Sequence, residues 1–448
     1  MITIRPSQRT VQRLRRSPLT SPRQWRRRVA FWAGAVLVSL VAIGFAQLAD
    51  AATVAFASLA SADPWIALVV APCGLALCAF LTRHVFPGAQ GSGIPQVIAS
   101  MHIPDPGTIA RLLSLRIAAG KVLLTLLGLL SGASIGREGP TVQVGASVMQ
   151  ALGTYLRLPA AGAQRALVLA GGAAGIAAAF NTPLAGVVFA IEELSHSFEA
   201  RTSGTVLTAV IISGIATLSL VGNYAYFGTT AAQVDLGAAW FAVVLCGVAG
   251  GVLGGLFSAV LVRTAQGVPG RAGQWLGRRP LLFAALCGLG LAALGLISGG
   301  ATYGTGYAQA RGLVEGHANL PATFFLLKLA ATAISYLSGI PGGIFAPSLS
   351  IGAGLGHSIS LLIPGGTPGA IVLLGMVGYF AGVVQAPITA TVIVLEMTEN
   401  QRMTIPLMAT AMLAFGVSRL ICRRPLYGAL ARRFLQVVQG RPGTGRPA

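Results

Sequence analysis

The chain has 448 residues, of which 54% are hydrophobic and only 9% are charged, and its mean hydropathy is +0.76. Soluble globular proteins carry about 25% charged residues, so this composition excludes an ordinary soluble domain. Several apolar runs approach the length of about 20 residues that a helix needs to cross a bilayer. Glycine, with 59 residues, suits close helix packing in lipid. The sequence therefore predicts an all-α polytopic membrane protein.

The positive charge is concentrated at the two ends of the chain. The formal net charge is +20; nine arginines fall within residues 1–28, and six more lie between Arg423 and Arg446. Basic segments beside apolar helices mark the cytoplasmic side, so residues 1–28 and 422–448 are predicted to be cytoplasmic tails. Nucleic-acid binding is the alternative, but the tails lack interleaved aromatic residues and a folded module. We therefore expect no nucleic acid partner, contact with membrane lipid, and a single domain over residues 29–421 in the cell (inner) membrane.

Apolar segments with the length of whole or half membrane spans follow one another along this domain. In chain order they cover residues 29–49, 64–83, 108–135, 141–156, 164–192, 204–222, 237–262, 280–298, 320–339, 348–363, 369–396 and 403–421. The end of the first, Ala49-Asp50-Ala51, resembles a signal-peptidase site, but an apolar stretch of about 19 residues favours an uncleaved helix. The loop 222–237 has no Lys or Arg and the loop 263–280 has four arginines, so they are predicted outside and inside, respectively.

Recurring motifs indicate two related halves, over about residues 29–222 and 237–421. Three patterns recur in order, at offsets of 204 to 213 residues: Gly91-Ser92-Gly93 with Gly304-Thr305-Gly306, Glu138-x-Pro140 with Phe345-x-Pro347, and Pro183 and Glu192 with Pro387 and Glu396. Repeated halves with broken helices are typical of transporters whose substrate binds near the membrane midplane. Internal symmetry alone does not separate a transporter from a channel.

Four short motifs interrupt the apolar sequence: Gly-Ser-Gly-Ile-Pro at 91–95, Gly-Arg-Glu-Gly-Pro at 136–140, Gly-Ile-Phe-Ala-Pro at 343–347 and Pro-Leu-Tyr at 425–427. In the first three, a glycine precedes a proline that suits the first turn of a helix, so each predicts a helix N-terminus. Such a terminus presents unpaired N–H groups and about half a positive charge, which favours an anion. For any one motif alone, a loop that only breaks a helix is the better explanation.

Together and in this order, the four motifs resemble the CLC family of chloride channels and proton-coupled chloride transporters, over about residues 30–435. The resemblance implies a homodimer in which each subunit has two inverted-topology repeats of broken, tilted helices and its own ion pathway. It also implies a central chloride, held by the hydroxyl groups of Ser92 and Tyr427 and by helix N-termini. The backbone residues that the resemblance assigns to this chloride are Arg137, Glu138, Gly139, Ile344 and Phe345.

Glu138 is the acidic residue of the second motif. An ionisable residue at membrane depth is by default a functional-site hypothesis, although Arg137-Glu138 also suits a turn at the membrane surface. The resemblance makes Glu138 the gating glutamate on the external side of the chloride. A carboxylate and a chloride compete for the same helix termini, so an ionised Glu138 can plug the site and a protonated one can swing away. One side chain can thus link proton binding to anion movement.

Proton transport through the protein requires a second acceptor toward the cytoplasm. The run Asn181-Thr182-Pro183-Leu184-Ala185-Gly186 leads to two adjacent acids, Glu192-Glu193. In the family, transporters keep an acid at the second of these positions, whereas many channels have an apolar residue there. The resemblance therefore assigns the internal proton to Glu193 and predicts proton-coupled chloride antiport. A solvated helix end beside Ser195 and His196 is the alternative for the two acids. A passive voltage- or pH-gated chloride channel is the alternative for the function.

Other side chains carry no recognisable chemistry. The five cysteines and five histidines are scattered without metal-ligand spacing, so we expect no metal and no cofactor. The sequence has no nucleophile elbow, no His-Glu-x-x-His and no phosphate-binding loop, which leaves an intramembrane enzyme as a remote alternative.

Two features depart from the family pattern. Gln96 stands where many relatives have glutamate, and Ile98 leaves Lys121 without an obvious acidic partner, so the surroundings of Lys121 are not predicted. The chain ends soon after Tyr427, without the paired nucleotide-binding (CBS) modules of many eukaryotic relatives. This compact length favours a prokaryotic member of the family.

Overall fold

The computed structural model describes residues 22–158, 161–195, 200–222, 225–234, 240–265, 267, 270–363 and 367–438. Within these ranges the chain is helical, with two isolated β-bridges and no strand. Seven described segments are long and apolar enough to cross a membrane: Arg28–Ala62, Pro64–His84, Pro106–Leu130, Gly204–Val221, Trp240–Ala265, Pro280–Ile297 and Gln401–Ile421. The predicted all-α class is confirmed. Most of the predicted basic N-terminal tail and the last ten residues lie outside the described residues.

The helices of the first half are α2 (Pro22–Ala62), α3 (Ala67–His84), α4 (Ile94–His102), α5 (Pro106–Leu112), α6 (Leu115–Leu130), α7 (Glu138–Tyr155), α8 (Ala161–Phe180), α9 (Pro183–Phe189) and α10 (Ala200–Val221). A 3-10 turn, η1 (Pro64–Ile66), precedes α3, and a π-helical turn, η2 (Ala190–Ser195), follows α9.

The helices of the second half are α11 (Trp240–Ala265), α12 (Gly270–Arg278), α13 (Pro280–Ile297), α14 (Tyr307–Val314), α15 (Phe324–Leu337), α16 (Phe345–Ser360), α17 (Pro368–Val384), α18 (Pro387–Thr398) and α19 (Thr404–Ile421), followed by α20 (Leu426–Val438). A 3-10 turn, η3 (Gln401–Met403), precedes α19.

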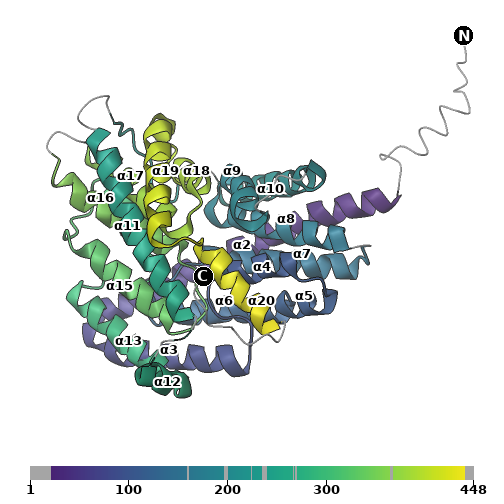
Figure 1. The fold of residues 1–448 in the computed structure, drawn as a ribbon, viewed down its shortest axis with the longest axis horizontal. Helices are drawn as coiled ribbons and strands as arrows, with labels where there is room; N and C mark the ends of the chain where they lie inside the picture. The colour runs from purple at the N-terminus through teal and green to yellow at the C-terminus, as the bar shows by residue number, and fades with distance from the viewer. Residues whose placement is uncertain are drawn as a thin grey trace, which may run out of the picture.

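The two halves pack their helices in the same pattern. In the first half α8 contacts α2, α7 and α10, and in the second half α17 contacts α11, α16 and α19. Figure 1 shows these two sets of helices side by side, at the right and the left of the view, with α20 crossing between them beside α4. The predicted pairing of Glu138 with Phe345 is confirmed, because these residues begin α7 and α16. The repeat boundaries at 222 and 237 remain a prediction.

Two long helices are interrupted at equivalent points. α8 and α17 are followed by Asn181 and Gln385, whose φ angles of 56° and 59° lie in the left-handed region that ends helices. The next helices, α9 and α18, each begin with a proline, which disfavours helical geometry in the residue before it. The predicted continuous segments 164–192 and 369–396 are therefore each divided into two helices.

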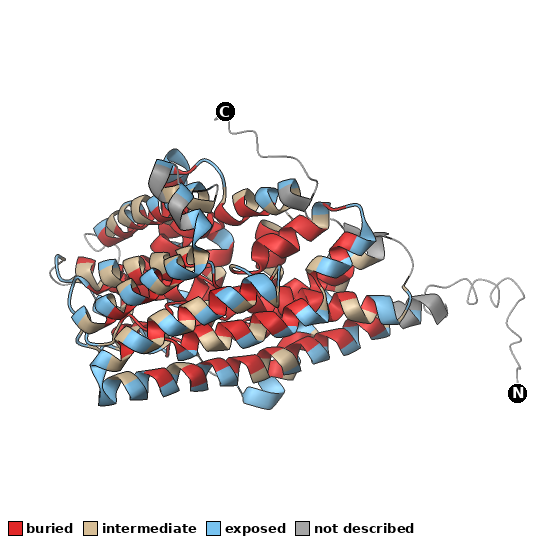
Figure 2. Ribbon diagram, turned by 90° about the horizontal axis from the view of Figure 1, so that it is seen from below, coloured by how far each residue is buried: buried red, intermediate tan, exposed pale blue. Residues whose placement is uncertain are grey.

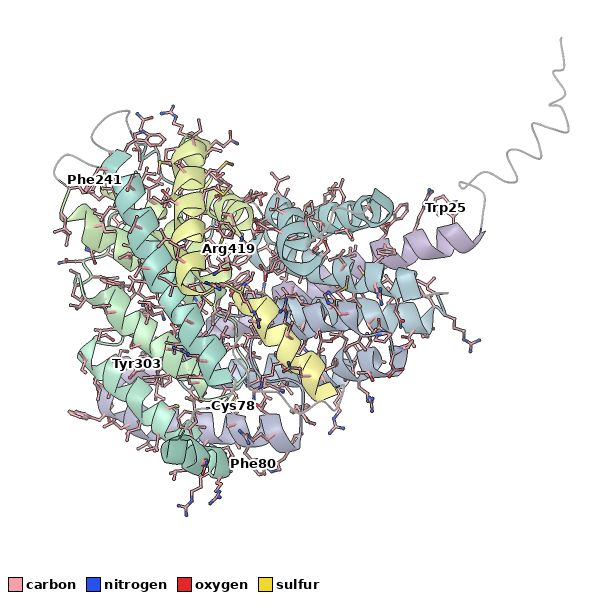
Figure 3. All side chains as sticks on the ribbon, viewed as in Figure 1. Trp25, Cys78, Phe80, Phe241, Tyr303 and Arg419 are labelled. Atoms are coloured by element: carbon pink, nitrogen blue, oxygen red, sulfur yellow. The ribbon has the colours of Figure 1, made fainter. Side chains whose placement is uncertain are left out.

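The buried residues form the centre of the molecule and the exposed apolar residues lie on the outer helices. Figure 2 shows this distribution, with pale blue on the outward faces of the helices and red between them. Large apolar side chains such as Phe80 and Phe241, which are 42% and 62% exposed, lie at the outer edge in Figure 3. An apolar outer surface of this extent is suited to lipid.

Glycine allows the central helices to touch through their backbones. A Cβ atom at Gly145 of α7 would lie 2.3 Å from the carbonyl oxygen of Gly171 in α8. We expect Gly145→Ala to force these helices apart and to destabilise the protein by about 1–3 kcal/mol, as overpacking does elsewhere. The midpoint of thermal unfolding in detergent should fall. Gly416→Ala in α19 is the matched control, because nothing lies within 4 Å of its Cβ position; equal midpoints for the two variants would contradict the expectation.

Candidate anion and proton site

The segment before α16 joins the starts of three helices. Gly343 exchanges two backbone hydrogen bonds of 2.7 Å with Gly136, in the loop before α7. The N–H group of Gly342 donates to the carbonyl oxygen of Gly91, in the loop before α4, at 3.1 Å. Three of the four motifs, far apart in sequence, therefore begin their helices at one place.

The loops at this place are in van der Waals contact. A Cβ atom at Gly139 would lie 3.0 Å from the carbonyl oxygen of Ser92 and 3.4 Å from the Cα atom of Gly343. At Gly93, φ is +97°, a conformation that favours glycine. The glycines of the motifs thus permit an approach that larger side chains would prevent.

The backbone residues predicted to bind chloride all lie at helix starts. Arg137 is the N-cap of α7 and Ile344 the N-cap of α16, and Glu138, Gly139 and Phe345 belong to the first turns. All five are buried. The first N–H groups of a helix have no partner within the helix and carry partial positive charge, so this arrangement can bind an anion.

The two predicted hydroxyl groups are close to the same place. Ser92 is 1% exposed, and its hydroxyl oxygen accepts a hydrogen bond of 3.3 Å from the N–H group of Ile94. Tyr427, in the first turn of α20, is buried with its ring 5.8 Å from that of Phe345. Its hydroxyl group has no hydrogen-bond partner within the described part of the chain. A buried donor of this kind is suited to an anion.

Glu138 is the first residue of α7, and its carboxylate lies inside the protein at the start of the opposing helix α16. One carboxylate oxygen, Oε1, accepts a hydrogen bond of 2.6 Å from the hydroxyl group of Tyr307. The other, Oε2, accepts one of 3.4 Å from the N–H group of Ala346 in the first turn of α16. Glu138 and Arg137 are both 0% exposed, so the alternative of a surface turn does not fit. The carboxylate occupies the kind of position that an anion takes at a helix N-terminus.

The guanidinium of Arg137 lies between Glu138 and a cluster of other polar and aromatic groups. Its Nε atom is 4.0 Å from Oε1 of Glu138, at the edge of ion-pair distance. The guanidinium forms an ion pair of 2.7 Å with Asp50 of α2, and it donates to the hydroxyl group of Tyr226 and the carbonyl oxygen of Ala46. It also lies over the rings of Tyr226 and Tyr307, 5.3 Å and 5.6 Å from their centroids. These contacts restrict the position of the start of α7, of which Glu138 is the first residue.

Sequence reasoning missed the aromatic and acidic parts of this cluster. Tyr307 directly follows Gly304–Gly306, the repeat of the first motif, and this position could have marked it as a candidate site residue. Asp50 was considered only as part of a cleavage-like site. Its pairing with Arg137, within a helix that continues to Ala62, places it instead in the packing of α2 against α7.

Glu193 is buried within the π-helical turn η2. It is 2% exposed, and its Oε1 atom has no hydrogen-bond partner within the described residues. A solvated helix end therefore does not describe Glu193. Single π-helical turns are frequent at functional sites.

Glu192, its neighbour, has a different environment. Its carboxylate accepts hydrogen bonds from the N–H groups of Ile388 and Thr389, at 3.2 Å and 2.7 Å, at the start of α18. In the symmetry-related position, Glu396 accepts hydrogen bonds of 3.0 Å and 2.7 Å from the first turn of α9. Each repeat thus caps a helix N-terminus of the other repeat. Glu192 therefore has a role in helix capping that Glu193 does not share.

Lys121 supports the loop of the first motif. Its ammonium group is buried and donates to the carbonyl oxygens of Gly91 at 2.9 Å and Gln90 at 3.3 Å. Gln96 donates to Gln90 as well, at 2.7 Å. Within the ranges that the structure describes, no carboxylate forms an ion pair with Lys121. The surroundings that the sequence did not predict are therefore backbone carbonyl groups.

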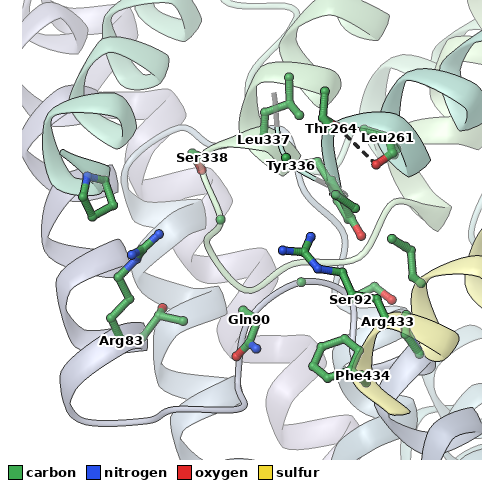
Figure 4. A pocket seen from close by; sticks show the side chains of 18 of the residues that line it. Arg83, Gln90, Ser92, Leu261, Thr264, Tyr336, Leu337, Ser338, Arg433 and Phe434 are labelled. Carbon is green, nitrogen blue, oxygen red and sulfur yellow. Dashed lines mark hydrogen bonds between the residues drawn. The ribbon is translucent and has the colours of Figure 1, made fainter. Parts of the chain in front are cut away.

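A cavity of about 690 Å³ leads away from Ser92. It is lined by Gln96, Tyr336 and residues of α20, among them Arg433, and by Arg83 on the opposite wall (Figure 4). Two guanidinium groups beside a cavity attract anions to it. Residues of the basic loop 263–280 also line this cavity. For metals, the described residues contain no group of three or more His, Cys, Asp or Glu placed to hold an ion.

The fold and the site define a polytopic membrane protein in which buried helix starts converge in an arrangement that can bind an anion. Residues 73–419 match the sequence model of the voltage-gated chloride channel family. The H(+)/Cl(−) exchange transporter ClcA of Yersinia pestis is 34% identical over 373 residues, covering 80% of this chain and 75% of the relative. The transporter of the same name from Salmonella paratyphi A is 32% identical over 374 residues, covering 80% and 76%.

Solved structures show the same fold. A slow cyanobacterial Cl−/H+ antiporter superimposes with a TM-score of 0.77 at 25% identity, covering 93% of this chain and 99% of that one. A CLC-type fluoride/proton antiporter gives a TM-score of 0.76 at 22% identity, covering 90% and 97%. The chain belongs to the CLC family and is a multi-pass membrane protein with the predicted inverted repeats.

Proposed function

We propose that this protein exchanges chloride for protons across a membrane. The observation that carries the proposal is the position of Glu138, whose carboxylate accepts a hydrogen bond at the start of α16, where an anion is expected to bind. The exchange activity of the relatives supports it. An exchanger of this kind moves ions without making or breaking covalent bonds, so the proposal includes no enzymatic activity.

The exchange follows from competition for one site. Chloride binds among the starts of α4, α7 and α16, with the hydroxyl groups of Ser92 and Tyr427 as further donors. An ionised Glu138 occupies part of that site, and a protonated Glu138 loses its attraction to the helix N-termini and gives way. A proton leaving Glu138 then passes toward Glu193, which is buried.

The proposed orientation places the cavity at Ser92 on the cytoplasmic side. The basic loop 263–280 and α20 line this cavity, and positive charge favours the cytoplasmic face. Glu138 then faces the outside. Both termini are proposed to be cytoplasmic and the membrane to be the cell (inner) membrane. The homodimer and the lipid contact rest on the family and on the exposed apolar residues of α10 and α19, such as Ile215 and Ile405.

Flux through liposomes tests the proposal. In vesicles that contain the purified protein, an outward chloride gradient is expected to drive protons against their own gradient, because chloride movement past an ionisable Glu138 is coupled to the binding and release of its proton. The measurement is the internal pH, recorded while the membrane potential is clamped. Chloride movement without uphill proton movement would show a passive channel instead. Vesicles without protein provide the leak control.

A further inference from the structure

We propose that Tyr307 is a positioning residue that holds Glu138 in the anion site and thereby sets how strongly this carboxylate competes with chloride. The proposal rests on the function proposed above and adds a residue to it. Tyr307 is the first residue of α14, and its hydroxyl group donates a hydrogen bond of 2.6 Å to Oε1 of Glu138. This is the shorter of the two hydrogen bonds that reach the Glu138 carboxylate.

The ring of Tyr307 is held by aromatic neighbours. Its centroid lies 5.1 Å from that of Tyr226, in a stacked arrangement, and 5.3 Å from that of Phe227. The guanidinium of Arg137 lies over the same ring. Packing on several sides restricts the rotamers of the side chain, so the hydroxyl group has a defined position before any ion arrives.

The backbone of Tyr307 is held as well. The loop before it ends in Gly306, a left-handed N-cap with φ of +85°. Lys328 of α15, which is buried, donates to the carbonyl oxygens of Thr302 at 2.9 Å and of Gly304 at 2.8 Å. Lys328 thus supports this loop as Lys121 supports the equivalent loop of the first half. In the second half, this loop therefore places the hydroxyl group of Tyr307 against the carboxylate of Glu138.

The direction of the effect follows from the chemistry of the hydroxyl group. An O–H group forms its stronger hydrogen bonds with a charged acceptor, so Tyr307 stabilises the ionised, plugging form of Glu138 more than the protonated form. Chloride must displace this carboxylate in order to bind. Removal of the hydroxyl group should therefore weaken the plug and make chloride bind more tightly.

Tyr307→Phe removes the hydroxyl group and keeps the ring packing. We expect the dissociation constant for chloride, measured by calorimetric titration of the purified full-length protein at neutral pH, to fall about tenfold. Tyr303→Phe is the matched control. It lies in the same loop, and its hydroxyl group donates to the carbonyl oxygen of Ala292, not to Glu138; its chloride affinity should equal that of the wild type. Size-exclusion chromatography verifies that both variants fold.

The same substitution in a Glu138→Gln background separates positioning from a general structural effect. With the carboxylate absent, Tyr307→Phe should change chloride affinity no further. An unchanged affinity in Tyr307→Phe alone, or an equal gain in both backgrounds, would overturn the role of Tyr307. If Glu138→Gln itself left chloride affinity unchanged, the proposed competition between Glu138 and chloride would fail instead. The two failures are therefore distinguishable.

Discussion

Glu138→Gln is expected to abolish proton transport while chloride continues to move. The amide has nearly the volume of the carboxylate, so the packing at the start of α7 is retained. It carries no charge and binds no exchangeable proton in the physiological range, so it can neither act as an anion at the start of α16 nor deliver a proton. In liposomes, proton flux should fall to the leak of empty vesicles. Chloride flux should stay within about tenfold of the wild type, or ~1.4 kcal/mol in barrier height.

The matched control for this substitution is Glu315→Gln. Glu315 pairs with Arg311 at 2.9 Å, on an exposed part of the protein, and has no contact with the anion site. Its variant should retain the ratio of protons to chloride. Uphill proton movement in Glu138→Gln would remove Glu138 from the exchange. A loss of chloride flux together with proton flux would indicate that the carboxylate supports the structure of the site and does not block it.

The parts of the site that the sequence predicted are those that depend on the backbone. Gly136–Pro140 and Gly343–Pro347 each specify a helix start through glycine and proline, and helix starts have the same electrostatic character wherever they occur. The spacing between the two motifs also gave the pairing of Glu138 with Phe345. For these reasons the starts of α7 and α16 and the pairing of the repeats were accessible before the structure, whereas a shared chloride at these starts was implied by the family resemblance and remains a proposal.

The parts that the sequence did not predict depend on side chains from distant segments. Tyr307 lies 169 residues after its partner Glu138. Asp50 lies 87 residues before its partner Arg137. Neither residue belongs to a glycine and proline motif. The division of the segment 164–192 at Asn181 was missed for a different reason. A left-handed residue before a proline breaks a helix, yet the apolar character of the sequence continues across the break.

Glu193→Gln is expected to remove proton transport and to spare chloride. Glu193 is buried in η2 and belongs to none of the three helix starts that are proposed to bind the anion, and Glu192 beside it already accepts the N–H groups of α18. A glutamine at 193 retains the shape of the side chain, so η2 should keep its path. What it loses is the ability to accept a proton that comes from Glu138. In the same liposomes, proton flux should fall to the leak, with chloride flux again within about tenfold.

Glu193→Asp separates the chemistry of this position from its packing. Aspartate keeps a carboxyl group but shortens the side chain by one methylene, so a proton acceptor is retained at some cost in packing. Partial proton transport in Glu193→Asp together with none in Glu193→Gln would identify the exchangeable proton as the required feature. Full coupling in Glu193→Gln would show that another internal donor suffices. Since a gating role for Glu138 fits a channel and an exchanger alike, the proposal of exchange depends most directly on Glu193.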